Sequence, residues 1–134
     1  MIIGIDFDGT CVTHEFPKVG SDIGAIPVLK ELVKNGHQLM LWTMRSDNQS
    51  SFPNVLQDAI KWFKDNEIPL FGVNENPEQI RSKWSLSNKQ YAHLYIDDAA
   101  LGIPLIHDEL SERPYVDWIK VRELLVKYKL LASI

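Results

Sequence analysis

The sequence predicts an α/β protein with a mostly parallel, doubly wound sheet between layers of helices. Short apolar segments of strand character alternate along the chain with amphipathic segments of helical period. Polar residues directly follow several of the strand-like segments. Because ligands bind beyond the carboxyl ends of the strands in such sheets, these polar residues are the candidates for a functional site.

The first half of the chain predicts two strands and two helices. Residues 2–5 form a run typical of a buried strand, and an irregular stretch with a proline and two glycines covers residues 9–20. Apolar residues at helical spacing predict a helix over residues 26–35, which the following glycine ends. A continuous apolar strand is expected at residues 37–43 and a second helix at residues 53–66.

The second half predicts further strands and a last helix. A short strand is expected at residues 70–73, followed by a polar turn, NENPEQ, at residues 74–79. Residues 94–96 predict a fourth strand that runs into an acidic pair, and residues 105–106 a minimal fifth strand. The final helix is expected to start near Pro114.

Composition is typical of one globular domain over residues 1–134, with 45% hydrophobic and 24% charged residues. The net charge of −4 supplies no positive field that would attract nucleic acid or an anionic membrane. Cys11 is the single cysteine, so we expect a packed thiol in a reducing compartment. The short apolar runs and the absence of a signal-like segment before the first strand predict a soluble, cytoplasmic protein.

Carboxylates follow two of the predicted strands. Asp6 and Asp8 come after the first strand, one residue apart, and Asp97 and Asp98 come after the fourth. Four clustered carboxylates repel one another unless a cation neutralises them. Hard oxygen ligands with open positions suit Mg²⁺, which shares its coordination shell with a phosphate. The sequence therefore predicts a magnesium and phosphate site at this edge of the sheet.

Several neighbouring residues would complete such a site. An aspartate beside the metal can attack phosphorus, and a second carboxylate can transfer protons to the leaving group and from water. Thr43 and Lys89 are expected to bind the phosphoryl oxygens. Arg45 is a further candidate for a phosphate or substrate contact, and Lys83 competes with Lys89 for the lysine role. We favour Lys89 because it lies closer to the fourth strand.

The arrangement resembles the haloacid dehalogenase superfamily. The segment DFDGT matches that family's first motif at every position, and LMLWT matches the second, an apolar strand ending in serine or threonine. Lys89 meets the third motif, and LYIDD matches the fourth, an apolar strand ending in an acidic pair. The four motifs follow in the family's order over residues 2–98. The resemblance implies a Rossmann-like three-layer fold and a single catalytic domain.

The resemblance also implies a role for each motif residue. Asp6 would be the nucleophile and Asp8 the general acid and base. Mg²⁺ would be held by Asp6, the main-chain carbonyl of Asp8 and Asp98, with Asp97 near it. The second aspartate favours a phosphatase or phosphotransferase over a dehalogenase. We expect a phosphatase, a magnesium-dependent hydrolase of phosphomonoesters. The residues expected to contact the substrate are Thr43, Arg45, Lys89, Gly9 and Thr10.

Two alternatives remain beside the phosphatase. A receiver-like signalling domain combines similar residues, but its phosphoacceptor follows the third strand. Here that strand ends in GVNEN, with no aspartate, and a second acidic pair follows the fourth strand instead. This order disfavours a receiver. A catalytically weak phosphate-binding module is the other alternative.

No room is evident for the cap domain that closes the site in many members of this superfamily. Caps enter after the first motif or between the second and third. Here residues 10–26 could form only a flap, and the predicted helix and strand largely fill residues 43–89. We expect a capless enzyme with an open site, rimmed by the loop that carries His14 and Lys18, and by Arg45. Its substrate would be a small phosphorylated compound or the terminal phosphate of a polymer.

Overall fold

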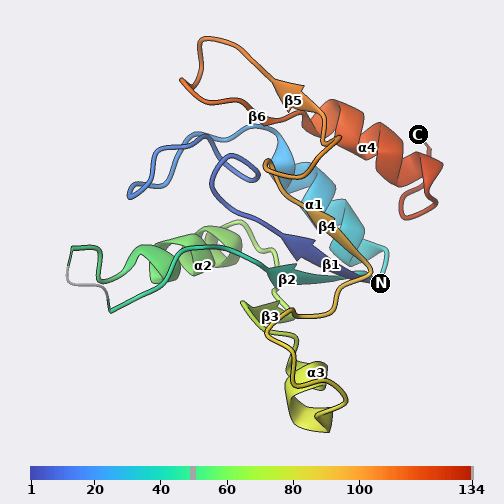
Figure 1. Cartoon of the computed structure of the whole chain (residues 1–134). Coiled ribbons are helices and arrows are strands. Elements are labelled where there is room, and N and C mark those ends of the chain that lie inside the picture. Colours follow the sequence, from blue (N-terminus) through green and yellow to red (C-terminus); the bar gives the residue numbers. More distant parts are fainter. Residues whose placement is uncertain (49–50, 134) are drawn as a thin grey trace.

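A parallel four-stranded sheet forms the centre of the computed structural model, which describes residues 1–48 and 51–133. The strands are β1 (Ile2–Ile5), β2 (Gln38–Leu41), β3 (Gly72–Val73) and β4 (Leu94–Ile96). They lie in the order β3-β2-β1-β4, and every neighbouring pair is parallel (Figure 1). The predicted α/β class and parallel sheet are confirmed, and the arrangement is consistent with a Rossmann-like fold.

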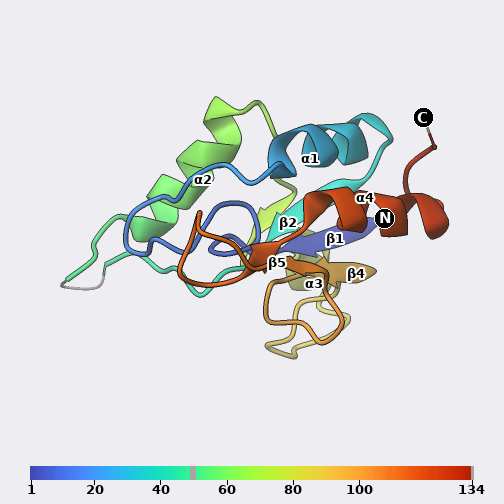
Figure 2. The same cartoon turned by 90° about the horizontal axis from the view of Figure 1, so that it is seen from above.

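The helices lie on different sides of the sheet (Figure 2). Helices α1 (Ala25–Lys34) and α2 (Val55–Asp65) lie on one side, and the short α3 (Pro77–Ser82) lies on the other (Figure 2). Helix α4 (Trp118–Lys127) packs beside α1, where a two-pronged ion pair joins Arg122 to Glu31. Among residues 1–48 and 51–133, no helix has the length and apolar character that crossing a membrane requires.

Side chains of β1 alternate between the two faces of the sheet and thereby set the position of the site. Ile3 and Ile5 are fully buried in the core that α1 and α2 cover. Gly4 and Asp6 therefore face the opposite side. There the Tyr95 ring lies over Gly4, only 2.5 Å from the position that a Cβ would occupy. Asp6 consequently stands at the carboxyl edge of the face that α1 and α2 leave open.

Helix α3 replaces the polar turn predicted at residues 74–79. The Asn76 side chain caps it by accepting hydrogen bonds from the main-chain N–H groups of Glu78 and Gln79, and Pro77 occupies its first turn. Asparagine before proline is a helix start signal, so the sequence contained this information. The apolar period was too short to reveal a helix of six residues.

The last helix was predicted to start near Pro114, but a short strand comes first and the helix starts at Trp118. Residues Tyr115–Val116 form strand β6, which pairs antiparallel with β5 (Leu105–Ile106). Strand β5 was predicted, but it belongs to this separate two-stranded sheet instead of the parallel one. Helix α4 begins only afterwards, where the Asp117 side chain accepts a hydrogen bond from the Lys120 N–H.

Cys11 is fully buried, as expected for a packed thiol. Its sulfur donates a hydrogen bond to the main-chain oxygen of Asp6 at 3.3 Å. Burial raises the pKa of the Cys11 thiol well above its usual value, and the carboxylates of Asp6 and Asp8 raise it further. A thiol that resists ionisation is a poor nucleophile, so Cys11 serves packing.

Candidate active site

Three carboxylates meet at the carboxyl edge of the parallel sheet. Asp6 follows β1, and Asp97 and Asp98 follow the neighbouring β4, because Ile5 and Ile96 lie opposite each other in register. One oxygen from each of the three carboxylates lies within 4.8 Å of the other two. This grouping is the convergence that the sequence predicted for these three residues. Such a set of hard oxygen donors could hold a divalent cation.

The turn after β1 holds the aspartates in place. Gly9 has a φ of 80°, and a Cβ there would lie 2.3 Å from His14 Nε2 and 2.5 Å from Asp98 Oδ2. The Thr10 hydroxyl donates a hydrogen bond to Asp6 Oδ2 at 2.7 Å and accepts one from the Asp98 main-chain N–H at 2.9 Å. Gly9 and Thr10 are both buried. Both residues therefore organise the carboxylates, and their contact with a substrate stays a prediction.

His14 makes a contact that the sequence did not predict. Its Nε2 lies 2.7 Å from Asp98 Oδ2, and both side chains are only 14% exposed. The sequence predicts only that His14 lies in the loop that rims the site. Because 84 residues separate His14 from Asp98, only the folded loop reveals the pair.

Burial and mutual repulsion disturb the ionisation of this cluster. Burial, followed by the proximity of Asp98 and Asp97, raises the pKa of Asp6 to about 8. Burial and the Asp98 carboxylate likewise raise the pKa of Asp97. Burial alone would raise the pKa of Asp98 too, but its hydrogen bonds with His14 and Asp6 outweigh burial and lower it. A bound cation would relieve this repulsion, so the donor set fits a metal.

Asp8 lies next to the cluster but is bound by an arginine. Its Oδ1 and Oδ2 accept hydrogen bonds of 2.8 Å from Nη2 and Nε of Arg45. The side chain of Asp8 is 14% exposed, and it lines the same hollow of about 420 Å³ as Asp6. Arg45 is only 2% exposed. The guanidinium of Arg45 is thus bound to Asp8, and the contact of Arg45 with a phosphate or substrate stays a prediction.

Thr43 lies at the end of β2, where a side chain missed by the sequence analysis supports it. Thr43 lines two hollows together with Asp6 and Asp97. The main-chain N–H of Thr43 donates a hydrogen bond of 2.8 Å to Asn74 Oδ1. Asn74 has a φ of 55°, a left-handed conformation that asparagine tolerates better than most residues. The asparagines of GVNEN after the third strand could have indicated a left-handed residue at Asn74.

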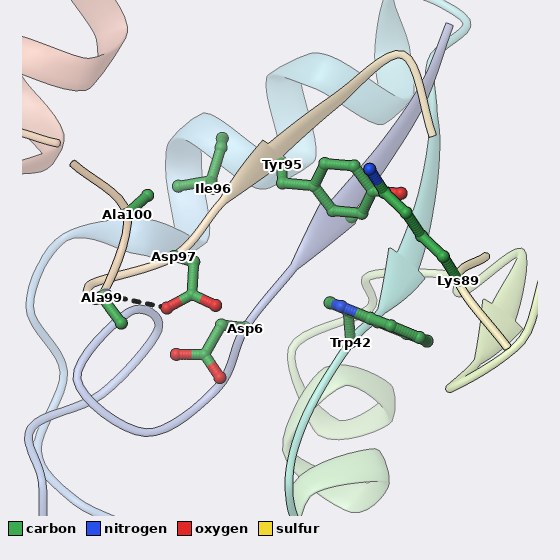
Figure 3. Close-up of a pocket in the computed structure, with 9 residues that line it drawn as sticks. Asp6, Trp42, Lys89, Tyr95, Ile96, Asp97, Ala99 and Ala100 are labelled. Atoms are coloured by element: carbon green, nitrogen blue, oxygen red, sulfur yellow. Dashed lines mark hydrogen bonds between the residues drawn. The ribbon is translucent and has the colours of Figure 1, made fainter. Parts of the chain in front are cut away.

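Lys89 reaches the site from the segment that precedes β4. It lines a hollow of about 300 Å³ with Asp6, Trp42 and Tyr95. In Figure 3 the Lys89 side chain lies beside Tyr95 and Trp42, and Asp6 lies at the other side of the hollow next to Asp97. Lys83 and Lys89 are both exposed, and Lys83 ends α3 with a φ of 52°. The structure thus brings Lys89, the residue we favoured, to the same hollow as Asp6.

A solved structure shows which proteins this chain is similar to. No model of a known protein family matches the chain, and no curated protein matches it either. Among solved structures, a conserved protein from Bacteroides thetaiotaomicron is 32% identical, with a TM-score of 0.73. The match covers 96% of this chain and 91% of that one. This chain belongs to the same family as that protein. The agreement over nearly the full length of both chains supports the α/β fold described above.

Proposed function

We propose that the protein is a magnesium-dependent phosphatase that hydrolyses phosphomonoesters through an aspartyl phosphate on Asp6. The observation that carries the proposal is the gathering of Asp6, Asp97 and Asp98 at one sheet edge. Thr43 and Lys89 line hollows that contain Asp6 as well. This combination of nucleophile, candidate metal ligands and candidate phosphate contacts supports the resemblance to the haloacid dehalogenase superfamily.

A metal ion would be held by residues that the fold already gathers. The carboxylates of Asp6 and Asp98 and the main-chain carbonyl of Asp8 would coordinate Mg²⁺, with Asp97 beside it. When bound, the cation would neutralise the carboxylates and the phosphoryl charge. The raised pKa of Asp6, about 8, agrees with a site built for such a cation.

Hydrolysis would proceed in two steps, formation of an aspartyl phosphate on Asp6 and its hydrolysis by water. An oxygen of Asp6 attacks phosphorus while the bond from phosphorus to the leaving oxygen breaks, and Asp8 donates its proton to that oxygen. Water then attacks the phosphoryl group and returns a proton to Asp8. Inorganic phosphate leaves, and the Asp6 carboxylate is restored. Thr43 and Lys89 bind the phosphoryl oxygens in both steps.

The finer features of the fold belong to this proposal. We place the protein in a doubly wound, haloacid-dehalogenase-like architecture whose second layer is reduced to α3 and neighbouring loops. Between Thr10 and α1, the structure contains a loop with isolated β-bridges, and α2, β3 and α3 use the chain between Thr43 and Lys89. This arrangement supports a capless, open site for a small phosphorylated compound or a polymer terminus.

A catalytically weak phosphate-binding module is the second candidate. The observation that favours it is the engagement of both Asp8 oxygens by Arg45. A general acid needs one oxygen that carries a proton and faces the leaving group. Each Asp8 oxygen accepts one hydrogen bond from Arg45 and has a second lone pair, so turnover requires that this second position carries the proton and faces the leaving group.

Steady-state hydrolysis distinguishes the two candidates. Purified protein with Mg²⁺ is expected to release phosphate from a panel of phosphorylated sugars, nucleotides, peptides and oligonucleotide ends, and from p-nitrophenyl phosphate. Chelation with EDTA should abolish the activity, and added Mg²⁺ should restore it. Phosphate binding without turnover on any member of the panel would favour the binding module. Turnover that survives chelation would contradict the metal-dependent mechanism.

Magnesium is expected to stabilise the protein more strongly at alkaline pH. Because the pKa of Asp6 is raised to about 8, the metal-free folded protein holds this proton more tightly than the unfolded chain. The resulting stabilisation is complete at low pH and is lost as pH rises through about 8. Mg²⁺ binds the carboxylate form of Asp6, so at low pH the metal must displace a proton that already stabilises the fold. At high pH the proton has left, and bound Mg²⁺ supplies the stabilisation instead.

The measurement is the shift in Tm on adding Mg²⁺, at about pH 6 and about pH 9. The shift should be larger at the higher pH, and Asp6→Asn should remove most of the difference between the two. Equal shifts in the wild-type protein at both pH values would show that Asp6 does not exchange its proton for the metal.

A further inference from the structure

The guanidinium of Arg45 has all of its hydrogen-bond donors satisfied inside the protein. Two of its five N–H groups bind the Asp8 carboxylate at 2.8 Å. The other three bind main-chain oxygens: Lys18 O at 2.8 Å, Val55 O at 2.9 Å and Pro17 O at 3.4 Å. One side chain thus joins Asp8 to the irregular loop before α1 and to the first residue of α2.

Aromatic rings further restrict the position of this guanidinium. Its central carbon lies 5.0 Å from the ring centre of Phe7 and 5.2 Å from that of Phe16. Phe7 is fully buried and packs edge-on against Trp62. Contacts of a cation with aromatic faces are favourable, and they strengthen when water is excluded. Arg45 is therefore held from several directions and cannot follow a moving Asp8 freely.

We propose that Arg45 is a positioning residue that orients Asp8 for proton transfer at the phosphoryl group on Asp6. This inference rests on the proposed phosphatase function and names a residue beyond the four motifs. The planar fork of arginine matches both carboxylate oxygens at once, so it sets the plane of the carboxylate as well as its location. Asp8 lines the same hollow as Asp6, where the leaving group of a phosphomonoester would lie.

A purely structural role for Arg45 makes a different prediction. If Arg45 only secured the loop at Pro17 and Lys18, its replacement would disturb the whole site. All substrates would then lose rate to the same extent. If Arg45 acts through Asp8, the loss should grow as the leaving group becomes poorer, because only poor leaving groups require a proton.

The test compares Arg45→Lys, Asp8→Asn and the double variant on an aryl phosphate with an acidic leaving group and on an alkyl phosphate. Lysine keeps the positive charge but not the two-pronged geometry. We expect Arg45→Lys to reduce kcat/KM, which reports transfer of the phosphoryl group to Asp6, about 10²-fold on the alkyl phosphate, in line with a small misplacement of a catalytic group, and much less on the aryl phosphate. In the Asp8→Asn background, adding Arg45→Lys should reduce kcat/KM by less than about threefold, because the residue that it positions is already disabled.

Two results would overturn the inference. One is an equal loss on both phosphates, and the other is an undiminished effect of Arg45→Lys in the Asp8→Asn background. The wild-type protein measured in the same assay separates this inference from the proposed function. Absence of Mg²⁺-dependent hydrolysis in the wild-type protein would reject the phosphatase and, with it, the catalytic role of the pair.

An NMR measurement keeps the inference testable if Arg45→Lys does not fold. The chemical shift of the Arg45 Nε–H should differ between the wild-type protein and Asp8→Asn, because this group donates a hydrogen bond to Asp8. The matched control is Asp47→Asn, which neutralises a carboxylate that accepts instead from the N–H groups of Leu56 and Gln57. An unchanged Arg45 resonance in Asp8→Asn would show that Arg45 does not hold this carboxylate.

Discussion

Asp6→Asn is expected to reduce kcat for phosphomonoester hydrolysis by at least about 10³-fold. An amide oxygen is a far weaker nucleophile than a carboxylate, although the two side chains have nearly the same size. The amide oxygen can still accept the hydrogen bond from the buried Thr10 hydroxyl, which is 2.7 Å long in the wild-type structure. The substitution also removes one of three crowded carboxylates, so the metal-free variant should unfold at no lower temperature than the wild type.

The measurement combines steady-state kinetics with thermal unfolding of the same preparations. Asp65→Asn is the matched control, since Asp65 is an exposed residue of α2 that pairs with Lys61. This control should retain the wild-type rate. Asp6→Asn with unimpaired turnover and an intact fold would rule out Asp6 as the nucleophile.

Asp8→Asn should lose rate in proportion to how much the leaving group needs a proton. For alkyl phosphates, whose alkoxide leaving groups are poor, we expect kcat/KM, which reports the step in which the leaving group departs, to fall about 10²–10⁴-fold. Aryl phosphates with acidic leaving groups should be affected much less. The structure supplies the reason for the contrast, because Asp8 shares a hollow with Asp6 but lies outside the group of three clustered carboxylates.

Rates on a series of phosphates with graded leaving-group acidity provide the measurement. A steeper dependence on leaving-group acidity in Asp8→Asn than in the wild type is the expected result. The same loss across the series would indicate that Asp8 contributes to metal placement alone. The metal requirement of the variant, measured by titration with Mg²⁺, then serves as an independent check.

The position of the three carboxylates could be predicted from the sequence, because it depends only on where parallel strands end. Asp6 and the Asp97–Asp98 pair directly follow apolar strands, and parallel strands end at a common edge. The main helices were similarly accessible, since their apolar residues recur over three turns in α1 and α2. Short elements such as α3 and β6 carry too few residues for a period to appear.

The sequence by itself therefore determined the alternation of strands and helices and the edge at which the carboxylates gather. Only the tertiary structure decided what each polar side chain near that edge contacts. Arg45 resembles any exposed arginine in the sequence, yet it is buried because Asp8, three main-chain oxygens and two aromatic rings surround it. His14 likewise pairs with Asp98, 84 residues away, because folding brings their two loops together. Local periodicity reports backbone conformation and the buried face, whereas a polar contact between distant residues depends on where two loops meet after folding.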